Sequence, residues 1–524
     1  MINQSLVLPL ALFFGTALLS MAQDKPNIIL IYADDLDADE ISYTSSDFNT
    51  WPTISGAKLL GVGNFSKAGA EKLLTPNIDG LAKEGVVFNR FYINATVCTP
   101  SRYCLLTGRF ATRGEELLQN HPAGSQVTLE WNPAILRNES NLPKELQKLG
   151  YRTGIVGKWH NLPTDIGLPK FKKEWVQADA TYETIKSHEK AIRDYYMKAK
   201  DYLSTGFGWD VVDRIEWGNS VVNLGWMCEG ALNFIQESKD KPFFLYLPLP
   251  VPHGQYKYPY NNISRLDPRV CADGILEKTP TALPSNADVY KRLKENGIPE
   301  ENVMATQMDD YVGAVLKKLD ELGVRKNTLI LFSSDHGSRG KNSCYEGAAR
   351  MPLFITWPGK LKPGTTNSML IANTDIASTL IEIAGGTPPQ DMTHDGRSFS
   401  KLLLGKKEPQ DWRNSIYIEA GNSKGVVTKQ WKYIANRVTP EIAEKMKADP
   451  GKVFWTGLNH HNYGTENMYK GYWDADQLYN LDTDLYEQNN LAGNPQYKEK
   501  LKEMKAELGK YVSDLPFWFD EFKK

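Results

Sequence analysis

Continuous runs of apolar, β-branched residues recur along the chain, and each run stops at a polar cluster. The first run, at 27–32, stops just before Asp34 and Asp35. Such runs are typical of strands that are buried on both faces of a parallel sheet. Three further runs, at 153–156, 243–247 and 328–332, precede His160, His253 and Asp335, respectively.

Helical patterns lie between these strands, at 75–85, 302–322 and 375–384. Strands that alternate with helices predict an α/β fold with a large, mostly parallel sheet flanked by helices. Ligands of such sheets bind at the carboxyl ends of the strands. Because the polar clusters all fall at these ends, we expect them to form one composite site.

The pattern changes after residue 410. Short apolar runs at 414–419, 425–434 and 477–481 predict strands, and 495–512 predicts a final amphipathic helix. We therefore predict two domains, an α/β catalytic domain at 23–410 and a smaller α+β domain at 411–524.

Residues 1–22 are predicted to be a secretory signal peptide. The apolar run at 6–19 is short for a membrane span, and Ser20-Met21-Ala22 resembles a cleavage site. Nothing else in the sequence indicates a transmembrane segment, so we expect a periplasmic or secreted protein without stable membrane insertion. An uncleaved anchor remains the alternative, because Met1 to Ser5 carries no Lys or Arg.

Composition gives no support to two classes of function, nucleic-acid binding and binding to an anionic membrane. The 524 residues are 41% hydrophobic and carry a formal net charge of -2, which offers no electrostatic basis for binding nucleic acid or an anionic membrane. Five cysteines in an exported chain of this length do not make a disulfide framework.

One of these cysteines, Cys98, opens the most informative segment of the chain. Thr99 is a suitable N-cap and Pro100 a suitable first helical residue, so we expect Cys98 just ahead of a helix N-terminus, where negative charge is favoured. Arg102, one turn on, can reach the same point. Residues 98–109 read CTPSRYCLLTGR. This segment resembles the type I sulfatase signature C-x-P-S-R-x-x-x-L-T-G-R at every fixed position.

The resemblance implies an alkaline phosphatase-like fold, in which a smaller C-terminal antiparallel sheet with a helix follows the large sheet. The pattern LYNLDTD at 478–484 fits that smaller domain. It also implies that Cys98 is converted to formylglycine (3-oxoalanine) by a formylglycine-generating maturation enzyme. The hydrate of this aldehyde then attacks sulfur, so the chain is expected to be a sulfuric ester hydrolase.

A metal site is expected beside Cys98. The carboxylates Asp34, Asp35 and Asp335 would repel one another at neighbouring strand ends unless a cation lay between them, and oxygen ligands suit Ca²⁺ or Mg²⁺. The resemblance favours Ca²⁺, places the residue at position 98 on the metal, and assigns a further ligand to His336. Imidazole is an unusual ligand for a hard cation, so His336 has a second reading, as a group that orients sulfate.

Four further side chains complete the expected site. Lys158 and His160 lie in Gly157-Lys158-Trp159-His160, which resembles the family's GKWH element. A lysine there would neutralise the nucleophile or sulfate, and a neutral imidazole would remove the proton that regenerates the aldehyde. By resemblance, His253 and Lys341 contact the leaving oxygen, and His253 is the expected acid.

The substrate is expected to be a sulfated polysaccharide or its oligosaccharides. Segments 42–74 and 445–473 resemble insertions, and the second carries Trp455, His460, His461, Asn462, Tyr463 and Tyr469, which suit sugar binding as well as packing. Algal glycans such as ulvan are favoured over glycosaminoglycans. The alternatives are a phosphodiesterase or phosphonate hydrolase of the same superfamily, a non-catalytic glycan-binding protein, and a thiol hydrolase, for which no Cys–His–Asn arrangement is evident.

Overall fold

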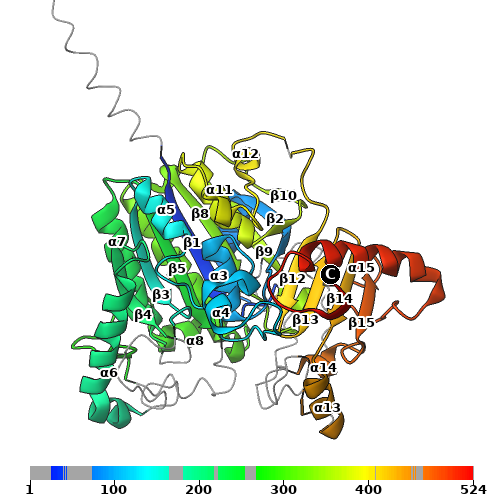
Figure 1. The fold of residues 1–524 in the computed structure, drawn as a ribbon. Coiled ribbons are helices and arrows are strands. Elements are labelled where there is room, and N and C mark those ends of the chain that lie inside the picture. The colour runs from blue at the N-terminus through cyan, green and yellow to red at the C-terminus, as the bar shows by residue number, and fades with distance from the viewer. Residues whose placement is uncertain are drawn as a thin grey trace, which may run out of the picture.

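The computed structural model describes residues 25–38, 41, 43, 73–163, 181–217, 222–253, 267–407, 409–449, 452–453, 455 and 464–522. A nine-stranded sheet lies at the centre of the larger part of the molecule (Figure 1). Its strand order is β10–β2–β9–β8–β1–β5–β3–β4, and β11 pairs with β2. In that order the strands are Thr365–Asn367, Val86–Tyr92, Arg350–Thr356, Thr328–Ser334, Asn27–Asp34, Phe243–Pro252, Arg152–Lys158 and Val211–Glu216, with β11 at Ile371–Ala372.

Most neighbours in this sheet are parallel, as predicted. β1 runs parallel to β5 and β8, and β3 runs parallel to β5 and β4, whereas β9 is antiparallel to both β2 and β8. Every residue of β1 is buried, because helices cover both faces of the sheet.

The helices form two layers. α9 contacts both α2 and α7, and all three of these helices contact the sheet. α3, α5 and α11 contact one another and form a second group, in which α5 contacts β3 (Figure 1). α6 packs against β4, and α8 against α9. The helices of this part are α2 (Pro76–Glu84), α3 (Cys98–Thr107), α4 (Glu115–Asn120), α5 (Leu142–Lys148), α6 (Tyr182–Leu203), α7 (Leu224–Ser238), α8 (Asn286–Glu295), α9 (Val303–Glu321), α10 (Glu346–Ala349), α11 (Thr374–Ile383) and α12 (Ser400–Leu403), and β6 (Val270–Cys271) pairs with β7 (Gly274–Ile275).

A separate antiparallel sheet of four strands follows, in the order β12–β13–β14–β15. One prediction is wrong here: 425–434 is not one strand but a hairpin. Thr428 turns the chain, because its N–H donates to the Trp431 carbonyl and its hydroxyl accepts from the Trp431 N–H. The elements are β12 (Ile416–Ala420), β13 (Ser423–Val427), β14 (Trp431–Asn436), α13 (Pro440–Ala448), α14 (Thr465–Met468), β15 (Asp476–Asn480) and α15 (Lys498–Val512), which packs on β13 and β14.

The smaller sheet is joined to the larger part beside α3. The Glu419 N–H donates to the Asn94 carbonyl over 2.7 Å, and the Asn94 amide donates to the Tyr417 carbonyl over 2.6 Å. β12 therefore holds the segment that leads into Cys98.

The signal peptide at 1–22 lies outside the described residues, and the domain boundary at 410 stays a prediction. Among the helices described, none combines the length and the apolarity needed to cross a bilayer.

Candidate functional site

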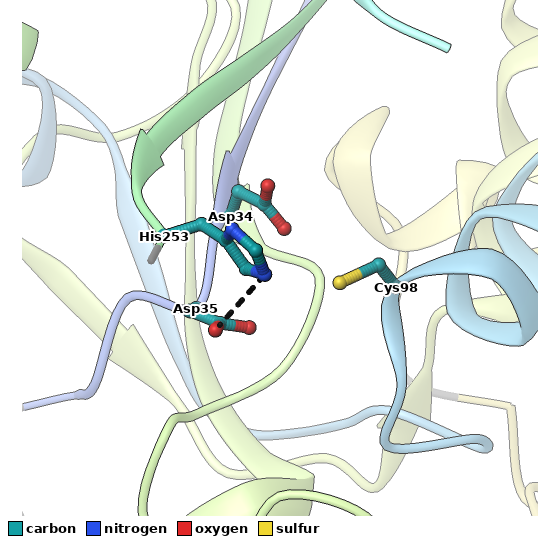
Figure 2. Close-up of side chains that lie close together, drawn as sticks. All are labelled: Asp34, Asp35, Cys98 and His253. Carbon is teal, nitrogen blue, oxygen red and sulfur yellow. Dashed lines mark ion pairs between the residues drawn. The ribbon is translucent and has the colours of Figure 1, made fainter. Parts of the chain in front are cut away.

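The carboxyl ends of four adjacent strands, β8, β1, β5 and β3, bring the expected residues together. Asp34 ends β1 and lies opposite Pro252, so His253 follows on β5 at the same level. Ala33 is paired with Ser334, which places Asp335 beside Asp34. Figure 2 shows Asp34, Asp35 and His253 facing Cys98, which approaches from the first turn of α3.

Each of the three aspartates is paired with its own buried cation. Lys158 Nζ lies 2.5 Å from Asp34 Oδ2, and Lys341 Nζ lies 2.8 Å from Asp35 Oδ1. The third pair joins Arg102 Nη2 to Asp335 Oδ2 over 2.8 Å, and Arg102 also lies 3.4 Å from Asp34 Oδ1.

These pairs set the protonation of the aspartates. Burial alone would raise the pKa of Asp34, but the charge of Lys158 holds it well below its usual value. Lys341 overcomes burial in the same way and lowers the pKa of Asp35 to about 2. For Asp335 burial dominates and raises the pKa to about 6.

Three histidines face this cluster. His336 Nε2 lies 3.2 Å from Asp35 Oδ1, and His253 Nε2 lies 3.6 Å from Asp35 Oδ2. Burial and the charge of Lys158 lower the pKa of His253 to about 3 and that of His160 well below its usual value. Both imidazoles are therefore neutral at pH 7 in this charge environment.

The start of α3 differs from the prediction. Cys98 is itself the first helical residue, and Val97, in an extended conformation, is the N-cap without a side-chain bond. Pro100 still lies in the first turn, where a backbone N–H has no partner within the helix, so the N–H that proline lacks is not missed. The Thr99 hydroxyl is not a cap, because it donates to the His160 carbonyl over 3.2 Å.

The Cys98 thiol is fully buried and within reach of two polar groups. Its Sγ lies 3.4 Å from His336 Nε2 and 3.6 Å from Lys341 Nζ. One nitrogen, His336 Nε2, lies beside both Cys98 Sγ and Asp35 Oδ1, whereas Nδ1 lies 3.0 Å from the Gly337 carbonyl oxygen, so these residues do not form the proton relay of a thiol hydrolase. Burial and the charge of Asp34 also raise the thiol pKa well above its usual value, and an unmodified thiol of this kind is a weak nucleophile at neutral pH.

The donor set suits a hard cation. Two overlapping groups have ligand atoms within 4.8 Å of one another: Asp34, Asp35, Cys98 and His253, and Cys98, Asp335 and His336. In the described part of the chain the buried Asp34 Oδ1 accepts no hydrogen bond, and its ion pair with Arg102 Nη2 is long, at 3.4 Å, so the oxygen retains lone pairs for a metal. The three carboxylates of these two groups match the oxygen preference of Ca²⁺ and Mg²⁺.

Several supporting residues did not stand out in the sequence. Tyr246, from β5, accepts a hydrogen bond from Arg102 over 3.3 Å. Ser101 donates to the Asp335 carbonyl over 2.6 Å, which ties α3 to the end of β8. Asn161 donates to the Thr99 carbonyl over 2.8 Å. Ser101 and Asn161 lie inside or next to motifs already noticed, and that adjacency is the one signal that could have identified them.

The predicted substrate segments are only partly described. Residues 42, 44–72, 450–451, 454 and 456–463, which include His460, His461, Asn462 and Tyr463, lie outside the described part. Trp455 and Tyr469 are described, and each has contacts with other residues of the protein. The Trp455 indole donates to the Tyr472 carbonyl over 2.7 Å, and Tyr469 stacks on Tyr345.

The fold and the site together define a hydrolase of the alkaline phosphatase-like superfamily. The chain belongs to the sulfatase family, whose model matches residues 26–386, and it is thus a sulfuric ester hydrolase. The model for the C-terminal part of N-sulphoglucosamine sulphohydrolase matches residues 334–453.

Individual relatives agree with this assignment. The chain is 27% identical over 521 residues to an ulvan-active sulfatase of Formosa agariphila, covering 95% of this chain and 81% of the relative. It is 26% identical to an N-acetylgalactosamine-6-O-sulfatase of Bacteroides thetaiotaomicron, covering 92% of each. A solved sulfatase of Pseudoalteromonas shares the fold, with a TM-score of 0.56, 21% identity, and coverage of 95% of this chain and 92% of that one.

Proposed function

We propose that the protein is an exported sulfatase that releases sulfate from a sulfated polysaccharide or its oligosaccharides, through formylglycine formed from Cys98. The observation that carries the proposal is the position of Cys98, at the start of α3 and opposite three aspartates at the ends of parallel strands. Two relatives at 26 and 27% identity are named for sulfated glycan substrates, one for ulvan and one for N-acetylgalactosamine 6-sulfate. Ulvan is our first candidate, and a glycosaminoglycan is the second.

Two groups would complete the site. When bound, Ca²⁺ (or Mg²⁺) and the formylglycine hydrate supply a Lewis acid and a nucleophile for the sulfur centre. Asp34, Asp35 and Asp335 would hold the cation, together with position 98 and His336.

The remaining residues handle charge and protons. Arg102, Lys158 and Lys341 are fully buried cations around position 98, and they would stabilise the negative charge that develops on the sulfate oxygens. His160 is neutral and can accept the proton that is lost when the aldehyde is regenerated. His253 would donate a proton to the leaving oxygen, because the negative charge of bound sulfate raises the pKa of an imidazole beside it.

The proposal is tested by sulfate release. Protein co-expressed with a formylglycine-generating enzyme is incubated with Ca²⁺ and ulvan, carrageenan, fucoidan, chondroitin sulfate or heparin oligosaccharides, and sulfate is measured by ion chromatography. We expect release from one glycan class, and none from Cys98→Ala. Cys98→Ser should stall after one transfer, because serine lacks a second hydroxyl.

Two results would contradict the proposal. One is phosphate release from a phosphodiester without any sulfate release, which would favour the phosphodiesterase alternative. The other is inactivity on every glycan when mass spectrometry shows the aldehyde at position 98, which would exclude a glycan sulfatase among the substrates offered.

A further inference from the structure

Trp131 places an exposed aromatic ring beside the site. Its side chain is 43% exposed, although tryptophan is among the most hydrophobic of side chains. The ring centroid lies 5.6 Å from that of His160, with the planes tilted by 56°. Among the described residues the other exposed large apolar side chains are Leu118, Met197, Leu404 and Trp473, and Trp473 has a ring contact with Tyr472.

The segment that carries Trp131 is fixed to the catalytic helix. The buried Asn161 side chain donates to the Pro133 carbonyl over 3.0 Å and to the Thr99 carbonyl over 2.8 Å. The Ile135 N–H donates back to the Asn161 carbonyl over 3.1 Å. One amide therefore links the turn after Trp131 to Thr99, the residue that follows Cys98.

The indole is also anchored at its edge. Its side chain is hydrogen-bonded to Glu130, and the Glu130 N–H donates to Asn132 Oδ1 over 3.1 Å. A tryptophan held through its polar edge keeps a broad apolar surface for another partner. Pyranose rings present C–H faces of matching polarity, and binding sites combine such apolar platforms with a few polar groups.

We propose that Trp131 is the platform on which the pyranose ring carrying the sulfate ester stacks. This inference rests on the proposed function and specifies its sugar-binding contact. Because the Trp131 ring contacts His160 and its segment is hydrogen-bonded to Thr99, the residue next to Cys98, a sugar stacked on Trp131 would lie beside the catalytic helix. Trp131 is a specificity-determining residue, whereas His160 and the cations act on the sulfate itself.

The test separates binding from chemistry. We expect Trp131→Ala to raise KM for sulfated ulvan or chondroitin oligosaccharides about fivefold to tenfold, with kcat changed less than about twofold, because the stacking energy is available in both ground and transition states. Trp131→Phe should keep KM within about threefold of wild type, because it retains an aromatic face. Leu404→Ala, an apolar residue after α12 and 54% exposed, should behave as wild type.

A second measurement does not depend on turnover. Calorimetric affinity for ulvan and chondroitin 6-sulfate tetrasaccharides is compared between Cys98→Ala and Cys98→Ala/Trp131→Ala. A loss of about fivefold or more in the double variant supports the platform even if the wild type releases no sulfate from these sugars. Unchanged affinity and KM in folded Trp131→Ala, or a wild type that binds no oligosaccharide and hydrolyses only 4-nitrophenyl sulfate, would overturn it.

Discussion

Three carboxylates and three basic side chains lie near position 98, and their pairing explains how so much charge is buried. An unpaired carboxylate in this setting would be protonated or would destabilise the fold. Here Lys158, Lys341 and Arg102 each keep one aspartate paired, within 2.5 to 2.8 Å. The same cations would remain next to a bound sulfate, where they are needed.

Metal binding is predicted to depend on Asp335 but not on Asp37. Asp335→Asn removes a carboxylate charge from the cluster, so we expect Ca²⁺ affinity to fall by about 100-fold or more. Asp37 is equally buried, but it accepts from the Ser338 hydroxyl and the Arg339 N–H instead. Asp37→Asn should lose less than about tenfold in affinity. Calorimetric titration of chelator-treated protein with Ca²⁺ checks both, and equal losses would refute the assignment of Asp335.

The residues that form the site could be predicted from the sequence, whereas the partner of each side chain could not. Asp34, Asp335 and His253 could be predicted to meet because each follows a buried strand, and strand ends share one edge of a parallel sheet. Which cation pairs with which aspartate depends on side-chain packing. The resemblance placed His336 and position 98 on one metal, but the direct contact of His336 Nε2 with Cys98 Sγ depends on the same packing.

Among the elements, α3 carries both Cys98 and Arg102, and hydrogen bonds fix it at its start, its middle and its end. Asn161 holds its first turn, Ser101 its middle and Gly108 its end. Gly108 is the C-cap, with φ at 69°, and an added Cβ would lie 2.6 Å from the Met392 carbonyl oxygen. The signature glycine thus has a structural reason that is independent of any maturation enzyme.

Gly108→Ala is therefore predicted to destabilise the protein through both strain and contact. A left-handed conformation costs an alanine about 1 kcal/mol, and the clash adds a further cost. Gly405→Ala is the matched control, because its φ is 77° and nothing lies within 4 Å of the added Cβ. We expect the thermal midpoint to fall at least twice as far for Gly108→Ala as for Gly405→Ala. Equal shifts would show that the Met392 contact is relieved without cost.

Element boundaries show where sequence patterns stop being sufficient. The strands β1, β3, β5 and β8 were located correctly because hydrophobic runs are interrupted by polar residues at the site. The 425–434 segment was not, because its two strands are separated only by the Thr428 turn, which carries neither glycine nor proline. Trp131 lies in an irregular segment that has no periodicity to be recognised.

In the whole molecule, the two sheets are joined by a buried cluster of charges. Lys432 Nζ, on β14, lies 2.6 Å from Glu346 Oε1 on α10 and 3.1 Å from Glu487 Oε1. The Glu346 N–H donates to Glu487 Oε2 over 2.7 Å. Two carboxylates therefore share one ammonium group. Burial raises the pKa of Glu487 to about 8, although the positive charge of Lys432 acts in the opposite direction.

This arrangement makes stability depend on pH. Folding raises the pKa of Glu487 from 4.5 to about 8, so the folded state favours the protonated side chain. The resulting contribution to the stability of the fold is fully present below pH 4.5 and is lost as the pH rises toward about 8. Glu487→Gln keeps the shape of the protonated side chain and cannot ionise. We therefore expect the difference in thermal midpoint, variant minus wild type, to increase by about 3 °C between pH 5 and pH 9.

The matched control is Glu444→Gln on α13, whose carboxylate is exposed and paired with Lys447. Its midpoint should follow the wild type at every pH, because an exposed pair contributes little to stability. Scanning calorimetry at pH 5, 7 and 9 in Ca²⁺-free buffer measures both variants without contributions from the metal site. A constant difference between Glu487→Gln and wild type across this range would mean that Glu487 is already ionised at pH 5. The joint between the two sheets would then contain two buried carboxylates held by Lys432 and Arg350, which lies 3.7 Å from Glu346 Oε2.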